Sequence, residues 1–413
     1  MRRLHAVALT TLAFSIPGAA CSSSASKPPA AAARTTTSRA VASAPVRGAK
    51  LPIAPADVYL PPTPLPLGRP GQVIWAQRVN GITFAPPQTV WRFLYHSRDQ
   101  VGRDVAVSAY AIVPKSAAPK AGRAVYAWAH GTTGLGDQCA PSKAIRENLP
   151  AYAGEVEGGN ALVVATDYEG LGTPGDHTYL AGRPEGQAIL DAVRAAGALP
   201  NAGTLGDVVL AGQSQGGGAA LFAAQLAPKY APELHLRGVL ASAPAAELAQ
   251  IASSDQSSSF KGLLLLAAAG LHAAYPAFAP ASFLTAAAES DLARVRTECV
   301  DATIARYRSR PGNEVVTVDP ARVAAVARIL DENSPGATSP NIPIMIVQGA
   351  QDEQIPISVS AALATKYCSH HAIVLRRVYP GASHDGVLDA AQDDAVGWIN
   401  ARLEDRPAPS NCA

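Results

Sequence analysis

Ser214 lies at the centre of the stretch Gly212-Gln213-Ser214-Gln215-Gly216, where small residues on either side permit a tight turn. A β-branched run (207–212) precedes the stretch, and an Ala-rich run of helical character follows it to residue 227. This order of strand, turn and helix suits a serine nucleophile, because the turn exposes the hydroxyl and the helix N-terminus points at the reacting carbonyl. In a chain with 34 glycines the five-residue pattern alone is weak, so the interpretation depends on partners elsewhere in the chain.

Two polar residues late in the chain could activate this serine. A serine hydroxyl is a poor nucleophile at neutral pH and needs a histidine base, which an acidic side chain orients. In a strand–turn–helix site the acid and then the histidine follow the serine, each after a late strand. Asp352 directly follows an apolar run at 342–350, and His384 ends the next such segment, at 372–384. The sequence therefore predicts Ser214, Asp352 and His384 as a catalytic triad.

Neighbouring residues offer alternatives for both partners. The pair His370-His371 competes for the role of base, but it comes before the last predicted strand rather than after it. Glu353 is adjacent to Asp352, and Asp385 is adjacent to His384, so each is an alternative acid.

Backbone N–H groups near the serine could stabilise the oxyanion that forms on the carbonyl. The N–H of Gln215, at the start of the predicted helix, is one expected donor. The second is expected in the loop after the third strand, which reads His130-Gly131-Thr132. We predict Thr132 as this donor, or Gly131 if the turn is offset by one residue. The alternative is a simple Gly-rich connector.

Strands that alternate with helices are predicted to position these residues. Apolar β-branched runs predict strands at 90–99, 104–114, 123–131, 160–168, 207–212, 237–244, 342–350 and 372–384, with the first two forming a hairpin. A helical pattern covers residues 184–199. This alternation predicts an α/β fold with a mostly parallel central sheet, helices on both faces and a site at the carboxyl edge. We assign residues 51–251 and 341–413 to this core.

Residues 252–340 break the alternation with Ala-rich, helix-like segments and are predicted to form an inserted helical cap. Within them, residues 262–288 are uncharged and long enough to suggest a membrane span. Pro276 and Pro280 interrupt this run, and predicted strands of one sheet lie on both sides of it. Both observations favour a pair of helices in the cap.

Composition and motifs argue against several other classes of protein. The chain has 413 residues, 48% of them hydrophobic, and its 34 basic and 32 acidic residues form no dense basic stripe. Nucleic acid is therefore not an expected partner. Residues 170–175 fit Gly-x-Gly-x-x-Gly, but Pro174 lies in the loop and Asp191 falls inside a predicted helix, which disfavours a dinucleotide site. We expect no cofactor and no metal, since Gly-x-x-x-x-Gly-Lys, His-Glu-x-x-His and Cys-x-x-Cys motifs do not occur.

The N-terminus has the basic, apolar and small-residue regions of an export signal. We therefore expect residues 1–20 to be a signal peptide and the chain to be extracellular or anchored to the outer face of the cell membrane. Similarity to a bacterial lipoprotein signal would make Cys21 the lipidated residue, whereas cleavage after Ala20 would give free secretion. Residues 21–50 contain no acidic and no aromatic residue and are expected to be a flexible linker.

Five cysteines occur in the chain, at positions 21, 139, 299, 368 and 412. If Cys21 is lipidated or removed, an even set of four remains in an oxidising environment. This predicts two disulfides, for which three pairings are possible.

Several stretches together resemble the secretory lipase family of the α/β-hydrolase superfamily, from about Leu51 to the C-terminus. They are "WAHGTTGLGDQCAPS" (128–142), "ATDYEGLGTPG" (165–175), "GQSQGGGAALFAAQLAP" (212–228) and "PGASHDGV" (380–387). The resemblance implies esters of fatty acids as substrates, the triad given above and a helical cap over the acyl site. It also implies the pairs Cys139–Cys299 and Cys368–Cys412. The short Gly-Thr-Thr loop departs from better-known members, because it has no acidic side chain beside the oxyanion hole.

The sequence thus predicts an exported serine carboxylic ester hydrolase that works through an acyl-enzyme intermediate. Its expected partner is a lipid or small ester substrate, with membrane attachment through the lipid anchor if Cys21 is modified. Two alternatives stay open: an envelope acyltransferase or aminopeptidase that uses the same triad, and a non-catalytic envelope protein with a hydrolase fold.

Overall fold

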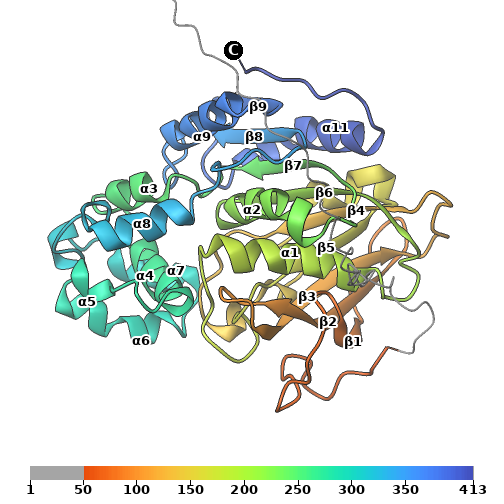
Figure 1. The fold of residues 1–413 in the computed structure, drawn as a ribbon, viewed down its shortest axis with the longest axis horizontal. Helices are drawn as coiled ribbons and strands as arrows, with labels where there is room; N and C mark the ends of the chain where they lie inside the picture. Colours follow the sequence, from red (N-terminus) through yellow and green to blue (C-terminus); the bar gives the residue numbers. More distant parts are fainter. Residues whose placement is uncertain (1–50, 413) are drawn as a thin grey trace, which may run out of the picture. The chain divides into compact units, whose positions relative to one another are not determined.

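One mostly parallel sheet forms the centre of the molecule. The structure is a computed structural model that describes residues 51–412, except for the side chains at positions 151 and 157. The strands of this sheet are ordered β1-β2-β3-β5-β4-β6-β7-β8-β9 (Figure 1). They are β1 Val73–Val79, β2 Gln88–Arg98, β3 Asp104–Pro114, β4 Arg123–Ala129, β5 Leu162–Thr166, β6 Leu205–Gln213, β7 Leu236–Ser242, β8 Ile344–Gly349 and β9 Val374–Tyr379. From β5 to β9 all neighbours are parallel, so the predicted sheet type is confirmed.

The N-terminal edge of the sheet is antiparallel. Strands β2 and β3 pair along their whole length, as the predicted hairpin requires. The turn between them closes through the Asp99 N–H, which donates to the Arg103 carbonyl (3.0 Å), and Gly102 supplies a φ of +88°. Strand β1 was not predicted: its apolar part ends at Ala76, and only this residue of the strand is buried.

Helices cover both faces of the sheet. Along β4, Val125 and Ala127 face the core that contains α1, α2 and α9, whereas Tyr126 and Trp128 face the core that contains η3, α10 and α11. Figure 1 shows α1 and α2 side by side across the strands. These helices are η3 Ala151–Gly159, α1 Gly182–Ala196, α2 Gln215–Tyr230, α9 Ile357–Ser369, α10 Val387–Ala390 and α11 Gln392–Leu403, with short 3-10 turns η1 Asp137–Cys139 and η2 Pro141–Lys143.

The segment between β7 and β8, residues 243–343, is here called the helical insertion. It contains α3 Leu248–Asp255, α4 Gly262–Ala274, η4 Pro280–Ser282, α5 Ala286–Ser290, α6 Leu292–Val295, α7 Val300–Tyr307, η5 Gly312–Glu314, η6 Pro320–Arg322 and α8 Ala324–Glu332. The predicted second helix of the apolar run is wrong. After α4 the chain forms only η4 and the five-residue α5, because Pro276 and Pro280 lack the N–H that a continuing helix needs. None of the helices in the described residues is long and apolar enough to span a membrane.

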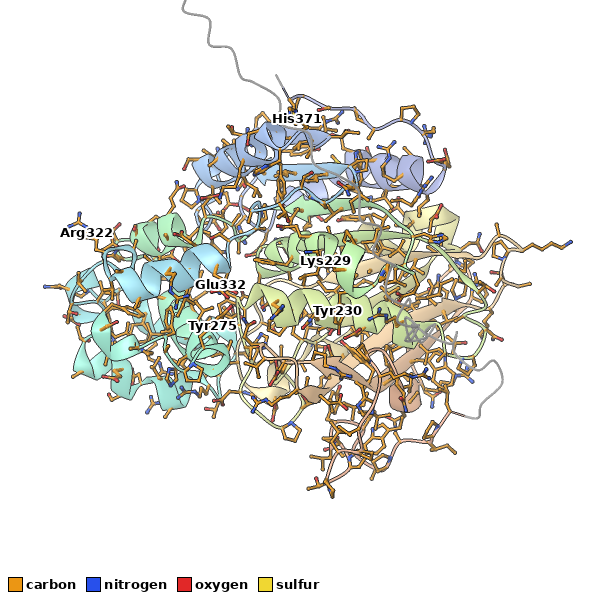
Figure 2. All side chains as sticks on the ribbon, in the orientation of Figure 1. Lys229, Tyr230, Tyr275, Arg322, Glu332 and His371 are labelled. Atoms are coloured by element: carbon orange, nitrogen blue, oxygen red, sulfur yellow. A yellow bond between two sulfur atoms is a disulfide. The ribbon has the colours of Figure 1, made fainter. Side chains whose placement is uncertain are left out.

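Tyr275, at the end of α4, connects the helical insertion to the sheet domain. Its hydroxyl accepts from Gln100 Nε2 of the β2–β3 turn (2.8 Å) and lies 3.0 Å from Glu332 Oε1. Figure 2 shows Tyr275 and Glu332 close together at the edge of the insertion. Beside them, Asn333 Oδ1 accepts the N–H of Gly182 at the start of α1 (2.9 Å). The insertion is therefore held against two separate elements of the core.

Candidate active site

Ser214 occupies the sharp turn between β6 and α2. Its backbone has φ 54° and ψ −118°, a conformation that costs an ordinary residue about 1–3 kcal/mol. Hydrogen bonds hold the turn on both sides. The Ser214 N–H donates to the Ser242 carbonyl (2.9 Å), and the Ser214 carbonyl accepts from the N–H groups of Gly218 (3.1 Å) and Ala245 (2.8 Å). Strand β7 and the segment after it therefore stabilise a backbone that the turn alone would not adopt.

Two glycines let α2 lie directly against the sheet. A Cβ at Gly216 would come 1.9 Å from the Ala129 carbonyl oxygen, and a Cβ at Gly212 would come 2.2 Å from the Gly216 oxygen. Any larger residue at either position would push α2 away from β4 and β6. The small residues around the serine thus have a specific steric function in the turn.

Asp352 and His384 meet at the carboxyl ends of β8 and β9. The His384 Nδ1 lies 2.9 and 3.0 Å from the two Asp352 carboxylate oxygens, and both side chains are buried. Asp352 also accepts from Gln348 Nε2 (2.6 Å) and from the N–H groups of Gln354 (3.0 Å) and Ile355 (2.8 Å). Because the carboxylate only accepts in this arrangement, the Nδ1 carries the proton and the Nε2 keeps its lone pair.

The loop of His384 is joined directly to the serine turn. Gln213, the residue before Ser214, donates from Nε2 to the His384 carbonyl (3.2 Å) and to Asp385 Oδ1 (3.3 Å). The alternative acids have other contacts: Asp385 accepts this bond, and Glu353 Oε2 accepts the His384 N–H (3.2 Å). The structure therefore brings the three predicted triad residues to one edge of the sheet.

The competing histidines lie elsewhere. His370 and His371 form the turn between α9 and β9, where both are exposed. Figure 2 labels His371 at the outer end of this part of the molecule.

The dinucleotide-like stretch 170–175 is a loop after β5. Asp191 is fully buried, and its carboxylate lies 2.8 Å from Arg194 Nη1 and 2.8 Å from the Tyr230 hydroxyl. Asp191 is thus engaged inside the fold rather than presented to a ligand.

The predicted oxyanion donors flank Ser214. Gln215 is the first residue of α2, and the first N–H groups of a helix have no partner within the helix. The loop 131–132 passes beside the serine, since a Cβ on Gly131 would lie 3.8 Å from the Ser214 Cβ. The Thr132 hydroxyl is held 2.8 Å from the Tyr179 hydroxyl. Both backbone segments therefore lie next to Ser214.

A buried polar cluster beneath the serine turn was not predicted from the sequence. The Gln215 Nε2 donates to Glu185 Oε1 (2.7 Å) and lies 3.2 Å from the His177 Nε2. Burial raises the pKa of Glu185 to about 8 and lowers the pKa of His177 to about 3. Burial also lowers the pKa of His130 to about 4. The sequence signal for this cluster was weak, because Glu185 lies near other polar residues, Arg183 and Gln187, at the start of α1.

One open cleft lies in the helical insertion. Its volume is about 410 Å³, and His272, Pro280, Leu292 and Arg296 are among its lining residues. None of the predicted site residues lines it. In the described residues, no group of histidine, cysteine, aspartate and glutamate side chains is arranged to hold a metal ion.

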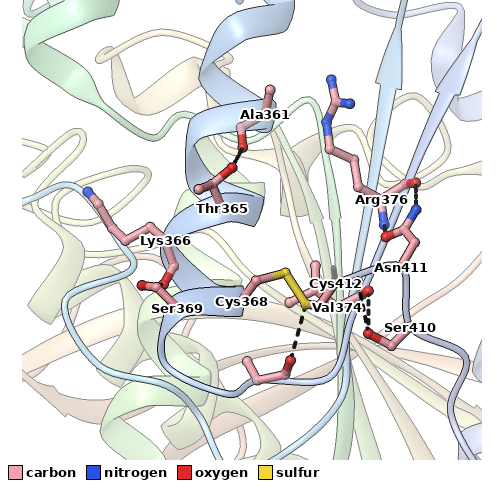
Figure 3. The surroundings of a disulfide bond; sticks show 11 residues. Ala361, Thr365, Lys366, Cys368, Ser369, Val374, Arg376, Ser410, Asn411 and Cys412 are labelled. Carbon is pink, nitrogen blue, oxygen red and sulfur yellow. Dashed lines mark hydrogen bonds between the residues drawn. A yellow bond between two sulfur atoms is a disulfide. The ribbon is translucent and has the colours of Figure 1, made fainter.

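Both disulfides that the resemblance implies are present. Cys139–Cys299 (Cα–Cα 5.5 Å) joins the segment after the Gly131–Thr132 loop to the start of α7. Cys368–Cys412 (Cα–Cα 5.4 Å) fixes the C-terminal tail to the end of α9 (Figure 3). Beside it, Asn411 Nδ2 donates to the Arg376 carbonyl of β9 (2.7 Å). Cys21 and the predicted signal and linker lie outside the described residues.

Comparison with known proteins defines the class first. Solved structures similar to this chain include Candida antarctica lipase A, which superposes with a TM-score of 0.71 at 22% identity over 84% of both chains. Together with the sheet order and the serine turn, this similarity identifies the α/β-hydrolase fold, as predicted.

The sequence comparisons then identify the family. Residues 152–411, well over half of the chain, match the family model described as secretory lipase. Lipase 6 of Candida albicans is 27% identical over 86% of this chain and 83% of its own length. A protein of Mycobacterium tuberculosis named a probable inactive lipase is 26% identical over 86% of this chain and 84% of its own. The chain belongs to the secretory lipase family.

Proposed function

We propose that the chain is a serine carboxylic ester hydrolase of the lipase or esterase type. The observation that carries the proposal is the buried Asp352–His384 pair, whose loop is hydrogen-bonded through Gln213 to the turn that holds Ser214 in a strained conformation. Strained backbone at a residue that other elements hold in place is typical of active sites. Membership of the secretory lipase family supports the same reaction class.

In the proposed reaction Ser214 Oγ attacks the ester carbonyl while the His384 Nε2 takes the hydroxyl proton. Asp352 holds the imidazole and stabilises its charged form. The carbonyl π electrons move to oxygen, and the N–H groups of Gln215 and Thr132 stabilise the resulting oxyanion. His384 then returns the proton to the departing alkoxide. Water, activated by the same histidine, releases the acyl group and restores Ser214.

The proposed substrates are esters of fatty acids, such as acylglycerols. We further propose that residues 51–251 and 341–413 act as the catalytic core and residues 252–340 as a cap over the acyl chain. Apolar side chains of α4 support this role: Leu264, Leu265 and Leu266 are buried in the same hydrophobic cluster as α2. Their burial packs the insertion against the core, as a cap over the site requires.

Hydrolysis of p-nitrophenyl esters of graded chain length tests the proposal. Wild type should cleave them, and Ser214→Ala and His384→Ala should each lower kcat by at least about 1,000-fold. Asp385→Asn, which changes a neighbouring carboxyl outside the proposed triad, serves as the control and should retain activity. Preference for aminoacyl anilides, or transfer of the acyl group to an added lipid alcohol in place of water, would point to the peptidase or acyltransferase alternatives.

The relative named as a probable inactive lipase supports a second candidate, that the chain is a non-catalytic protein with this fold. A fluorophosphonate probe distinguishes the two, because it reacts only with an activated serine. Labelling of wild type that disappears in Ser214→Ala supports the hydrolase. Folded wild-type protein that fails to react and does not cleave esters would overturn the proposal in favour of the non-catalytic function.

We also propose export, which rests on the predicted signal at residues 1–20 and on the family. Mass spectrometry of the mature N-terminus tests it. A diacylated Cys21 would show a lipid anchor, a start at unmodified Cys21 would show free secretion, and an intact residue 1 would contradict export.

A further inference from the structure

One short segment, residues 177–185, runs from the loop after β5 into the first turn of α1 and contacts the side chains of both proposed oxyanion donors. Gln215 Nε2 meets Glu185 Oε1 (2.7 Å) and His177 Nε2 (3.2 Å). The Thr132 hydroxyl meets the Tyr179 hydroxyl (2.8 Å). The two donor residues come from separate segments, the loop after β4 and the start of α2, so residues 177–185 are a shared support between them.

The side-chain amide of Gln215 is held in one orientation by its two hydrogen-bond acceptors. The His177 Nδ1 lies 2.8 Å from the Glu169 carbonyl oxygen, which can only accept, so Nδ1 carries the ring proton. The His177 Nε2 is then an acceptor for one Gln215 N–H, and Glu185 Oε1 accepts the other. Both amide hydrogens are used by buried partners. Rotation of this side chain would leave buried polar groups without partners, which is costly.

Glu185 is itself held in place. Its Oε1 also accepts the N–H of Leu180 (2.9 Å), and the side chain is buried in the first turn of α1. Helices α1 and α2 are in backbone contact here, since a Cβ on Gly186 would lie 2.8 Å from the Ala223 N. Movement of Glu185 therefore cannot be absorbed by space between the two helices.

Tyr179 extends the support to the helical insertion. Its ring is buried, and a Cβ on Gly270 of α4 would lie 2.4 Å from the Tyr179 Cβ. The ring centroids of Tyr179 and His177 are 6.1 Å apart. The insertion, the Thr132 loop and the cluster around Gln215 thus meet at one place.

We propose that His177, Tyr179 and Glu185 are positioning residues that fix the distance between the two oxyanion N–H groups. The inference rests on the proposed function. Donors must lie about 2.7–3.1 Å from the oxyanion, and loss of one typically lowers kcat by about 100- to 1,000-fold. Displacements far smaller than loss of a donor are also costly, because a 1 Å misplacement can lower the rate by about 100-fold.

Paired variants of Glu185 test the proposal with p-nitrophenyl butyrate as the substrate. Glu185→Gln keeps an oxygen that can accept from both Gln215 and Leu180, so it should retain kcat within about 3-fold at pH 6.5. Glu185→Leu removes the acceptor and should lower kcat by about 10- to 100-fold with KM changed less than about 2-fold. Equal kcat in wild type and Glu185→Leu would overturn the proposal.

Tyr179→Phe is a second test that stays informative if the leucine variant misfolds, because it removes one hydroxyl and little volume. We expect kcat to fall by about 5- to 10-fold at unchanged KM. Tyr230→Phe is the matched control. It removes another hydroxyl, the one bonded to Asp191, at the last residue of α2, the helix that begins with Gln215 (Figure 2). It should lower stability without lowering kcat, and a similar loss of kcat in both variants would contradict positioning.

A trifluoromethyl ketone separates this proposal from general damage to the fold. Ser214 adds to its carbonyl carbon and the electrons move to an oxygen that occupies the oxyanion hole, so its Ki reports the donors directly. Ki should rise in Glu185→Leu and Tyr179→Phe by the same factor by which kcat/KM falls. Unchanged Ki with reduced kcat would overturn the inference while leaving the proposed function intact. Wild type that neither cleaves the ester nor binds the ketone would overturn both.

Discussion

Ser214 is strained in a direction that only glycine relieves. Its φ of 54° lies in the left-handed region, and its ψ of −118° takes it outside the small basin that asparagine and aspartate visit. The hydrogen bonds to Ser242, Gly218 and Ala245 offset the free-energy cost of this strained backbone. A residue in this position contributes to reactivity at the expense of the stability of the fold.

This strain predicts that two inactive variants of Ser214 differ in stability. Ser214→Gly should unfold at higher urea concentration than Ser214→Ala, with a free energy of unfolding larger by about 1 kcal/mol. We expect the free energy gained by relief of the strain to exceed the cost of the larger conformational entropy that glycine has in the unfolded chain. Urea denaturation followed by tryptophan fluorescence measures the difference. Equal midpoints would mean that the turn relaxes when the hydroxyl is absent.

Single residues also show where prediction from the sequence ends. Asp352 and His384 could be predicted because each follows an apolar strand and the order along the chain has a chemical reason. Glu185 could not, because its contact with Gln215 depends on how α1 packs against α2. Its sequence neighbourhood shows only a polar residue near a helix start, and burial is a property of the tertiary fold.

At the scale of elements, the close contact between α2 and β4 depends on Gly216. We predict that Gly216→Ala lowers the free energy of unfolding by more than about 3 kcal/mol, since the new Cβ would overlap backbone atoms of Ala129 that cannot move independently. Gly397→Ala is the control. Gly397 is exposed within α11 and has no atom within 4 Å of an added Cβ, so alanine should stabilise by about 0.5–1 kcal/mol. Thermal unfolding of both proteins measures this, and equal shifts would contradict the packing explanation.

The two disulfides should differ in their effect on catalysis. Replacing either pair by serines should lower the free energy of unfolding by about 2–5 kcal/mol, because each closes a long loop in the unfolded chain. Only loss of Cys139–Cys299 should also lower kcat, since the segment after Thr132 is then held to the insertion without a covalent link, by hydrogen bonds such as that from the Leu135 N–H to the Glu298 carbonyl (3.1 Å). Urea denaturation and ester hydrolysis test the two effects separately. Equal loss of kcat in both variants would show that the effect is not local.

The elements themselves were predictable to different degrees. Strands β5 to β8 are buried on both faces, so their apolar β-branched runs stand out in the sequence. The N-terminal strand β1 has one buried residue and gives a weak pattern. The second half of the uncharged run after α4 was predicted as a helix, yet hydrophobicity there reflects burial of irregular turns, such as those of Phe278 and Phe283. Hydrophobic content predicts burial more reliably than it predicts the type of backbone.

At the scale of the whole molecule, buried ionisable groups determine how stability depends on pH. Burial raises the pKa of Glu185 to about 8 and those of Glu169 and Asp255 to about 7. Between the ordinary carboxyl pKa and these values the folded protein binds more protons than the unfolded chain, so stability falls as pH rises. His130 and His177, with pKa lowered by burial to about 4 and 3, act oppositely. The stability that these two histidines contribute is fully present above about pH 6.5 and is lost as the pH falls toward their pKa values in the folded protein.

The two groups of residues oppose each other below about pH 6.5, and only the carboxyls act between pH 6.5 and 8. We therefore predict that the free energy of unfolding decreases by about 2–3 kcal/mol over this interval, roughly half of it from Glu185. Glu185→Gln removes the titrating group but keeps its acceptor oxygen, so this variant should lose about half of the slope. Glu289→Gln, at an exposed position of α5, should keep the wild-type slope. Urea denaturation at half-unit pH intervals measures it. A slope unchanged by Glu185→Gln would mean that Glu185 is already ionised at pH 6.5, and the orientation of Gln215 would then depend on a buried negative charge instead of a neutral acceptor.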